Sequence, residues 1–260
     1  MTQIAVRRLT HRRTGRQLFR YAAREMSGPL PRVLYKYLPR EHADSLVDRG
    51  ELMFSTLSWF QNLEDRERGD EFEGTHKYFP VGGLEITRTE RDGRPHPPVT
   101  FTCPNRSLQS KAKGSDQIFI YSTSLRPGLT QFGDAGVPTA CVEIYDPAKF
   151  VLRLRAVLRR TPRAKVETLI HDEVRYYSFV DPPRNVYTLP DRLTMHKHEG
   201  FRDQHEYRIA FGTRRDVFDF EHVDYALAGE GIRQPTRALK DSDHRWKLRI
   251  GALYDCARML

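Results

Sequence analysis

Short runs rich in β-branched and aromatic residues recur along this chain, and turn formers end most of them. The runs are Val33–Tyr37, Glu51–Ser55, Gln117–Ser124, Ala140–Tyr145, Val174–Val180, Glu206–Phe211 and Leu248–Leu253. Because they outnumber the helical patterns and do not alternate with them regularly, they favour an α+β domain over a doubly wound parallel sheet. We therefore predict a mixed β-sheet core with flanking helices.

One helix is predicted between the first two runs. Residues 40–49 place Ala43, Leu46 and Val47 on one side, and Gly50 follows in a typical C-terminal capping position. The charge-dense segment QNLEDRERGDEFEG, residues 61–74, is predicted to be a loop that is either solvated or functional. Residues 82–98, which are polar and punctuated by Gly and Pro, predict a hairpin or a surface insertion.

Positive charge concentrates at the start of the chain. The net charge is +9 at pH 7, and residues 1–32 hold eight arginines against one acid, Glu25. We predict a basic arm over residues 1–32, with an amphipathic helix at 16–26 and a Gly-Pro linker at 28–31, followed by a single α+β domain over residues 33–260. The helix's arginine face fits equally well with a packed helix that is merely kept soluble.

The basic arm suggests an anionic partner. Arginines at this density could neutralise the phosphates of a nucleic acid, and an anionic membrane surface, an acidic protein or an organelle transit signal would fit the same composition. The candidate nucleic-acid-binding residues are Arg7, Arg8, Arg12, Arg13, Arg16 and Arg20.

Several classes of protein are disfavoured. Cys103, Cys141 and Cys256 lie far apart and form no C-x-x-C pair, which argues against a disulfide framework and a structural zinc site and favours the reducing cytoplasm. No apolar run approaches the roughly 18 residues that span a bilayer, and no secretory signal is visible. The chain also lacks a P-loop, a Rossmann glycine motif and H-E-x-x-H.

A metal site is a third possibility. His196 and His198 in the segment MHKHEG could chelate an ion in a small nuclease that also used the acidic loop. A working site needs further carboxylate or cysteine ligands, so solvated loop histidines are the favoured interpretation and no metal is expected.

Three separated elements carry the positive signal for function. They are Tyr35-Lys36-Tyr37 on the first strand, Ser122-Thr123-Ser124 at a strand end, and Gln204-His205-Glu206 at the start of another strand. In this chain order they resemble one branch of the ADP-ribosyltransferase superfamily. That branch has a basic residue on the first strand, Ser-Thr-Ser on a later one and Gln-x-Glu or Glu-x-Glu on a third. The resemblance implies a mostly antiparallel split sheet and NAD as substrate, although Lys36 stands where Arg or His is usual.

A second resemblance covers more of the chain, from about Val33 to Phe211. The segments LYKYLP, LMFST, GDEFEG, FIYSTS, ACVEIYDP and HKHEGFRDQHEYRIAF look like a widespread bacterial family of uncharacterised domains. Asp70-Glu71-Phe72-Glu73 replaces that family's Asp-Pro-Phe-Glu-like loop, and Phe201 stands where tryptophan is common. Members of the family occur near phage-defence and toxin loci, which implies a toxin or phage-defence effector.

The first resemblance implies roles for individual residues. Glu206 would stabilise the oxocarbenium-like transition state formed when the nicotinamide–ribose bond breaks, and Gln204, two residues earlier on the same strand face, would orient the acceptor. Ser122 and Ser124 would bind the ribose or brace Glu206. The residues expected to bind NAD are Tyr35, Lys36, Tyr37, Tyr121, Ser122 and Ser124.

Two alternatives stay open. Glu206 could form a structural ion pair with Arg208 or Lys197, or belong to an exposed strand edge of solvated polar groups. The whole protein could instead be a non-catalytic nucleic-acid-binding protein that uses the basic arm and the sheet tyrosines.

Overall fold

The computed structural model describes residues 27–62, 71–91, 94–128, 139–182, 189–219, 222–229 and 244–260. In this part of the chain, helices combine with mostly antiparallel strands, so the predicted α+β class is confirmed. The helices are α2 (Arg40–Arg49), α3 (Leu57–Gln61), α4 (Pro147–Arg160), α5 (Pro190–Thr194) and the 3-10 helix η2 (Glu199–Gln204). The predicted arm residues Arg7, Arg8, Arg12, Arg13, Arg16 and Arg20 lie outside the described residues, as does the predicted helix at 16–26.

Eight strands form one sheet, which we call the main sheet. Its order is β14-β2-β7-β1-β8-β15, and β12 and β9 extend it from β7. These strands are β1 (Leu34–Pro39), β2 (Glu51–Thr56), β7 (Ile118–Ser124), β8 (Thr139–Ile144), β9 (Lys165–Glu173), β12 (Glu206–Gly212), β14 (Arg245–Arg249) and β15 (Ala257–Met259). All of its described pairings are antiparallel.

The main sheet divides beside β7. Along one edge β7 pairs with β12 over its whole length. Along the other edge, β2 pairs only near the start of β7, with Ser55 opposite Ile120. β1 pairs only at the end of β7, with Tyr35 opposite Ser124. Between these two contacts, residues 121–123 have no described strand partner on that edge. We call this gap between β1 and β2 the split.

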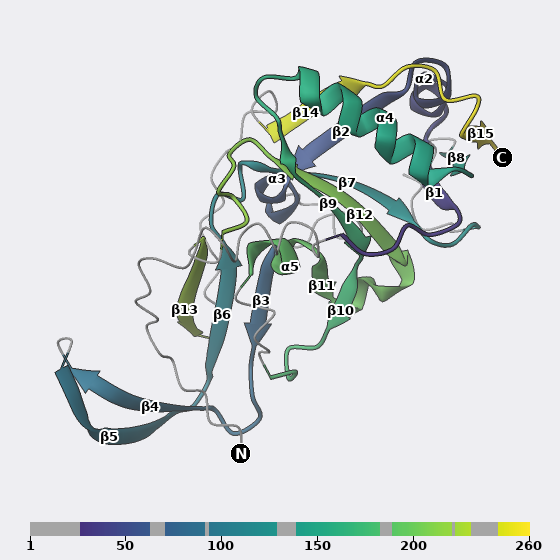
Figure 1. Cartoon of the computed structure of the whole chain (residues 1–260). Coiled ribbons are helices and arrows are strands. Elements are labelled where there is room, and N and C mark those ends of the chain that lie inside the picture. Colours follow the sequence, from purple (N-terminus) through teal and green to yellow (C-terminus); the bar gives the residue numbers. More distant parts are fainter. Residues whose placement is uncertain are drawn as a thin grey trace.

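Two hydrophobic cores cover the two faces of the main sheet. Side chains on β7 alternate between them: Phe119 and Tyr121 belong to the first core, and Ile118 and Ile120 belong to the second. Helices α2 and α4 bury their apolar sides in the first core, whereas α3 and α5 contribute to the second on the opposite face (Figure 1). A pocket forms at the split, and its walls include Tyr121 of the first core and Ile120 of the second.

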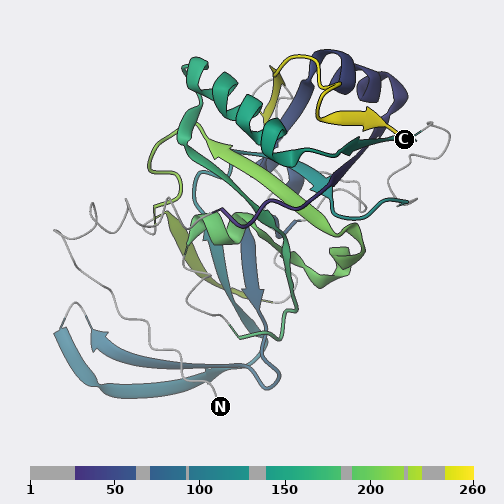
Figure 2. The ribbon, with the colours of Figure 1, turned by 45° about the vertical axis from the view of Figure 1, so that its right-hand side comes forward.

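The remaining strands lie mostly below the main sheet in Figure 1. Strands β13 (Val223–Gly229), β6 (Arg106–Ala112) and β3 (Thr75–Tyr78) form a three-stranded sheet, and β10 (Arg175–Tyr177) pairs in parallel with β11 (His196–His198). Strands β4 (Leu84–Arg91) and β5 (Arg94–Cys103) form a hairpin that projects from the rest of the molecule in both views (Figures 1 and 2). The hairpin predicted at residues 82–98 is therefore confirmed and extends to Cys103.

Local sequence signals account for the predicted helix. α2 spans Arg40–Arg49, buries Ala43, Leu46 and Val47, and ends at Gly50 in the left-handed conformation, with φ of 61°. The Gly50 N–H donates to the carbonyl of Leu46, 2.9 Å away, which satisfies an otherwise orphaned helix-end acceptor. The glycine is required because a Cβ here would lie 2.1 Å from the carbonyl oxygen of Gly251.

We expect Gly50→Ala to destabilise the fold. The left-handed conformation costs an alanine about 1–2 kcal/mol, and the clash with Gly251 adds to that loss. Gly82→Ala is the matched control, because Gly82 has φ of +93° but a Cβ added there would meet no heavy atom within 4 Å. Denaturant unfolding should show the larger loss for Gly50→Ala; equal losses would show that the contact with Gly251 costs nothing.

Several segments differ from the prediction, including β14, β10 and α4. The last strand is Arg245–Arg249 and not Leu248–Leu253, because the chain turns away after pairing with β2, while Leu253 packs into the first core from a loop. β10 is shorter than predicted and covers only Arg175–Tyr177. Helix α4 was missed altogether: the side chain of Asp146 caps it by accepting from the Lys149 N–H at 2.9 Å, and Pro147 occupies its first turn.

The end of the predicted basic arm packs on the domain where it is described. The Gly28 N–H donates to the carbonyl of His171 on β9 at 2.9 Å, and Leu30 packs against the first core. The predicted linker at 28–31 therefore lies against the main sheet. Among the described helices, none combines the length and apolar character needed to cross a bilayer.

Candidate functional site

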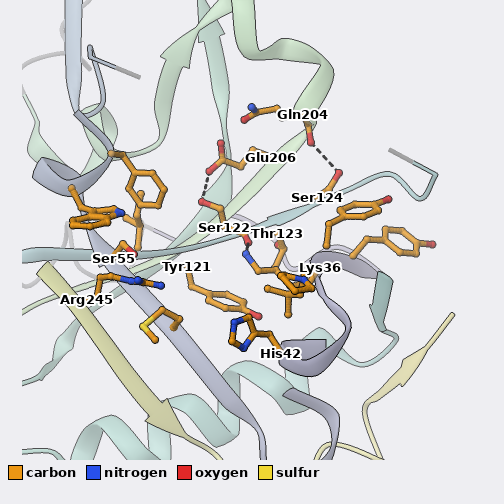
Figure 3. A pocket seen from close by; sticks show the side chains of 18 of the residues that line it. Lys36, His42, Ser55, Tyr121, Ser122, Thr123, Ser124, Gln204, Glu206 and Arg245 are labelled. Atoms are coloured by element: carbon orange, nitrogen blue, oxygen red, sulfur yellow. Dashed lines mark hydrogen bonds between the residues drawn. The ribbon is translucent and has the colours of Figure 1, made fainter. Parts of the chain in front are cut away.

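A pocket of about 520 Å³ opens at the split in the main sheet (Figure 3). Its walls contain the side chains predicted from all three separated sequence elements: Tyr35, Lys36, Tyr37, Tyr121, Ser122, Ser124, Gln204 and Glu206. The antiparallel pairing explains the convergence, because β7 ends between β1 on one edge and the start of β12 on the other. Lys36 and Glu206 thus face one cavity although they are 170 positions apart along the chain.

Lys36 bridges the split. Its Nζ donates to the backbone carbonyl of Ser122 at 2.6 Å and lies 4.6 Å from the centroid of the Tyr121 ring. The Ser122 carbonyl lies on the unpaired stretch of β7, where a neighbouring strand would otherwise donate a hydrogen bond to it. The Lys36 ammonium takes the place of that donor. Lys36 both fastens β1 to β7 and places a positive charge in the pocket wall.

The hydroxyls of the Ser-Thr-Ser segment brace the start of β12. The Ser122 Oγ donates to the carboxylate of Glu206, and the Ser124 Oγ donates to the backbone carbonyl of Gln204 at 2.9 Å (Figure 3). Glu206 lies opposite Ser124 in the strand register, so its carboxylate reaches Ser122 diagonally. The predicted bracing of Glu206 by Ser122 is present in the structure.

A buried ion-pair network holds Glu206. Its carboxylate accepts from the Arg208 Nε at 2.6 Å and Nη2 at 3.1 Å, and from the Lys197 Nζ at 3.2 Å. Arg208 also binds the carboxylate of Glu73, with Nη2 to Oε2 at 3.0 Å, and donates to the carbonyl of Thr194 at 2.6 Å. The four charged side chains are each at most 5% exposed and carry two charges of each sign. We call them the buried network.

The buried network keeps Glu206 ionised. Burial alone would raise the pKa of its carboxyl, but the charges of Arg208 and Lys197, with the hydrogen bonds from Arg208 and Ser122, hold the pKa well below its usual range. Burial likewise opposes the charge on Arg208, yet Glu206 and Glu73 outweigh it and raise the pKa of the guanidinium. Glu206 is therefore a carboxylate at neutral pH.

The two structural alternatives for Glu206 have different outcomes. The exposed strand edge is wrong, because β12 pairs with β7 and β9 on its two edges and Glu206 is only 4% exposed. The ion pair with Arg208 or Lys197 is confirmed, and it involves both cations. Because Glu206 also lines the pocket, the ion pair and the pocket position coexist.

Gln204 reaches the pocket by a different route from the predicted one. It ends the 3-10 helix η2 and is not on the strand, and His205 follows with a φ of 42°. The left-handed turn at His205 breaks the alternation that would have placed Gln204 and Glu206 on one strand face. The side chains still meet at Lys197, whose Nζ donates to Gln204 Oε1 at 2.9 Å and to Glu206.

Sequence reasoning missed several residues of the site. Glu73 was assigned to a solvated or functional loop, yet its side chain is buried against Arg208. The pocket wall also contains residues of α3 and β14 that no motif marked: Trp59, Phe60, Arg245 and Lys247. The available signal for Glu73 was its place between Phe72 and Gly74 in GDEFEG. The pocket residues of α3 and β14 become neighbours of the predicted residues only through the tertiary fold.

The predicted solvation of the histidine pair is wrong for His196. His196 is buried on β11, and its Nδ1 bonds the carbonyl of Arg192, whereas His198 Nδ1 accepts from the Gly200 N–H at 3.2 Å at the start of η2. Within the described ranges, no group of three His, Cys, Asp or Glu side chains is placed to hold a metal ion.

We expect buried histidines to make the fold acid-sensitive. Burial lowers the pKa of His76 and of His196 from 6.5 to about 4. Between pH 6.5 and pH 4 these histidines bind more protons in the unfolded chain than in the folded protein. The stability present above pH 6.5 is therefore lost as the pH falls towards 4. Each histidine then costs about 2 kcal/mol on going from pH 7 to pH 5.

Urea unfolding of His76→Phe at the two pH values tests this expectation. Phenylalanine preserves the ring packing against Tyr177, whose centroid lies 4.6 Å from that of His76. The variant should lose about 2 kcal/mol less than the parent between pH 7 and pH 5. An identical acid loss in both proteins would rule out His76 as a source.

The pocket suits a ligand with both aromatic and anionic groups. Tyrosine and tryptophan side chains provide flat apolar surfaces. Lys36 and Arg245 contribute positive charge, with Arg245 placed 5.7 Å from the Trp59 ring centroid, whereas Lys247 is paired with Glu51 at 2.7 Å in the same wall. An ionised acid at one end adds a site for a hydroxyl donor or a developing cation. Searches of protein-family models, of curated proteins and of solved structures found no match to this chain.

Proposed function

We propose that this protein is an ADP-ribosyltransferase-like enzyme that binds NAD in the pocket at the split. The observation that carries the proposal is the convergence of Lys36, Ser122 and Glu206 on one cavity. The pocket volume of about 520 Å³ supports it, because small-molecule sites fall roughly between 300 and 1,000 Å³. The aromatic and basic walls complement the bases and the diphosphate of NAD.

The reaction would break the bond between the nicotinamide nitrogen and ribose C1′. Nicotinamide leaves with the bonding electron pair, and the ribose passes through an oxocarbenium-like state. The carboxylate of Glu206, already ionised, would accept a hydrogen bond from the ribose 2′-hydroxyl in place of Ser122 and stabilise the positive charge. An acceptor nucleophile then bonds to C1′ and loses its proton.

The other polar groups would position the two substrates. Lys36 would attract the diphosphate as a point charge while it still holds the Ser122 carbonyl, and Tyr35 or Tyr121 would contact the nicotinamide ring. Lys197 fixes the Gln204 oxygen at 2.9 Å, and Gln204 would orient the acceptor. The neighbouring cations also weaken the field of Glu206, so its role depends on direct contact with the ribose.

The biological setting forms part of the proposal. Separated cysteines favour the cytoplasm, and the likeness to bacterial domains near phage-defence and toxin loci favours an effector that modifies nucleic acid or protein. Incubation with isotopically labelled NAD and cellular RNA, DNA and protein tests the activity. Nicotinamide release with label on one acceptor class is expected, whereas intact NAD under all conditions would contradict the proposal.

A non-catalytic nucleic-acid-binding protein is the second candidate. It is favoured by the eight arginines of residues 1–32 and by Tyr35 and Tyr37, which are partly exposed in the pocket wall. Oligonucleotide binding that weakens with salt but is indifferent to NAD and to Glu206→Gln would favour this candidate over the enzyme.

A further inference from the structure

Helix α4 and the turn after it present a cluster of arginines to solvent. The helix buries Phe150, Val151, Leu154 and Leu158 against the main sheet. Its opposite side and the following turn expose four arginines, which we call the α4 arginine face: Arg155, Arg159, Arg160 and Arg163. The sequence of α4, PAKFVLRLRAVLRR, contains no acidic residue that could pair with them.

These arginines differ from many others on the described surface. Several exposed arginines elsewhere pair with carboxylates, as Arg40 does with Asp44 at 3.2 Å and Arg215 with Glu167 at 2.7 Å, whereas others, such as Arg126 and Arg202, have no described ion pair. Within the described ranges, no carboxylate lies within ion-pair distance of the α4 arginine face. Four cations within nine residues of the chain, with no described counter-charge, create a local positive potential that a polyanion would neutralise.

Helix electrostatics explain only part of this arrangement. Arg159 and Arg160 lie in the last turn of α4, where the helix dipole favours positive charge. Arg155 lies one turn earlier, on the same side as Arg159, and Arg163 lies beyond the helix. The guanidinium of Arg163 lies 5.5 Å from the centroid of the Trp246 ring, which limits its freedom. The cluster therefore extends past the region where the dipole acts.

The α4 arginine face is separate from the pocket. Helix α4 packs on the face of the main sheet that carries the first core, as α2 does (Figures 1 and 2). No residue of α4 lines the pocket. A ligand on this helix would leave the NAD site open.

We propose that the α4 arginine face binds the phosphate backbone of a nucleic acid. Arginine forks bind phosphate oxygens in pairs, and a row of them contacts a backbone without reading its sequence. The overall charge of +9 favours such a partner. An anionic bilayer is the competing surface, because Leu152 is 64% exposed on the same helix. A single exposed leucine would bury little apolar surface in a bilayer, so the arginine cluster favours a nucleic acid as the partner.

A pair of charge-matched variants of the full-length chain tests the proposal. The first, Arg155→Gln/Arg159→Gln/Arg160→Gln/Arg163→Gln, removes the α4 arginine face. The second, Arg40→Gln/Arg214→Gln/Arg215→Gln/Arg258→Gln, removes four arginines that each pair with a carboxylate. Both lower the net charge by the same amount, so they separate a local site from overall attraction. Fluorescence anisotropy with short RNA and DNA oligonucleotides over a salt series measures binding.

The variant without the α4 arginine face should bind oligonucleotides at least about tenfold more weakly than the parent. The slope of log affinity against log salt concentration should become less steep by about 3 to 4. The control should stay close to the parent. Equal weakening of both variants would reduce the effect to net charge and overturn the site, as would absence of oligonucleotide binding by the parent. Binding to phosphatidylserine vesicles that depends on the face, without oligonucleotide binding, would assign it to a membrane surface instead.

Discussion

Replacing Glu206 by glutamine should lower nicotinamide release by about 100- to 1,000-fold, the usual effect of removing one group that stabilises transition-state charge. Glutamine keeps the shape of the side chain but removes the negative charge that, in the proposed reaction, would face the ribose of NAD. The loss should appear in kcat more than in KM, because the charge develops only in the transition state. Steady-state assays of released nicotinamide measure both constants.

A control is needed because Glu206 also belongs to the buried network. Glu73→Gln removes an equal charge from the other side of Arg208, and Glu73 makes no described contact with Ser122. Both variants should lose stability, which urea unfolding can quantify. If Glu206→Gln and Glu73→Gln lose activity in proportion to that stability, the role of Glu206 is structural and the enzymatic assignment of this residue is wrong.

Arg208→Leu should produce the largest loss of stability, about 3–5 kcal/mol. The guanidinium is fully buried, and its removal leaves Lys197 as the cation that the described contacts give to the carboxylates of Glu73 and Glu206. Two carboxylates and one ammonium, each at most 5% exposed in the parent, then lie together without the guanidinium. Equilibrium denaturation of the purified variant measures the change.

Arg249→Leu is the matched control for Arg208→Leu. Arg249 also pairs with a glutamate, Glu51 at 3.1 Å, but its side chain is 66% exposed. Solvent screens such a pair, so little change in unfolding free energy is expected. If the two substitutions had equal effects, burial would not be what makes the network at Glu206 important for folding.

The sequence predicted those parts of the fold that depend on local patterns. α2, its glycine cap and the strands at Leu34, Glu51 and Ile118 follow from periodicity and turn formers. α4 was missed because its arginines obscured the apolar spacing, although Asp146 and Pro147 marked its start. Strand order, and with it the split, depends on contacts between distant segments that no local pattern specifies.

The candidate site was predictable to a similar extent. Lys36, Ser122 and Glu206 were predicted to meet, and strand pairing brings them to one pocket. The position of Gln204 was right but its reason was wrong, since a left-handed turn at His205 replaces strand alternation. Glu73 could not be placed, because its partner Arg208 lies 135 residues away. A buried acid needs a buried cation, and a linear pattern does not identify which one.

We propose that the split in the main sheet holds NAD with its nicotinamide ribose beside Glu206. A crystal structure with a non-hydrolysable NAD analogue tests it most directly. We predict the analogue between β1 and β7, with the ribose 2′-hydroxyl hydrogen-bonded to the Glu206 carboxylate and the diphosphate near Lys36. An analogue bound elsewhere, or a pocket that stays empty at saturating analogue with Ser122 still bonded to Glu206, would contradict the claim.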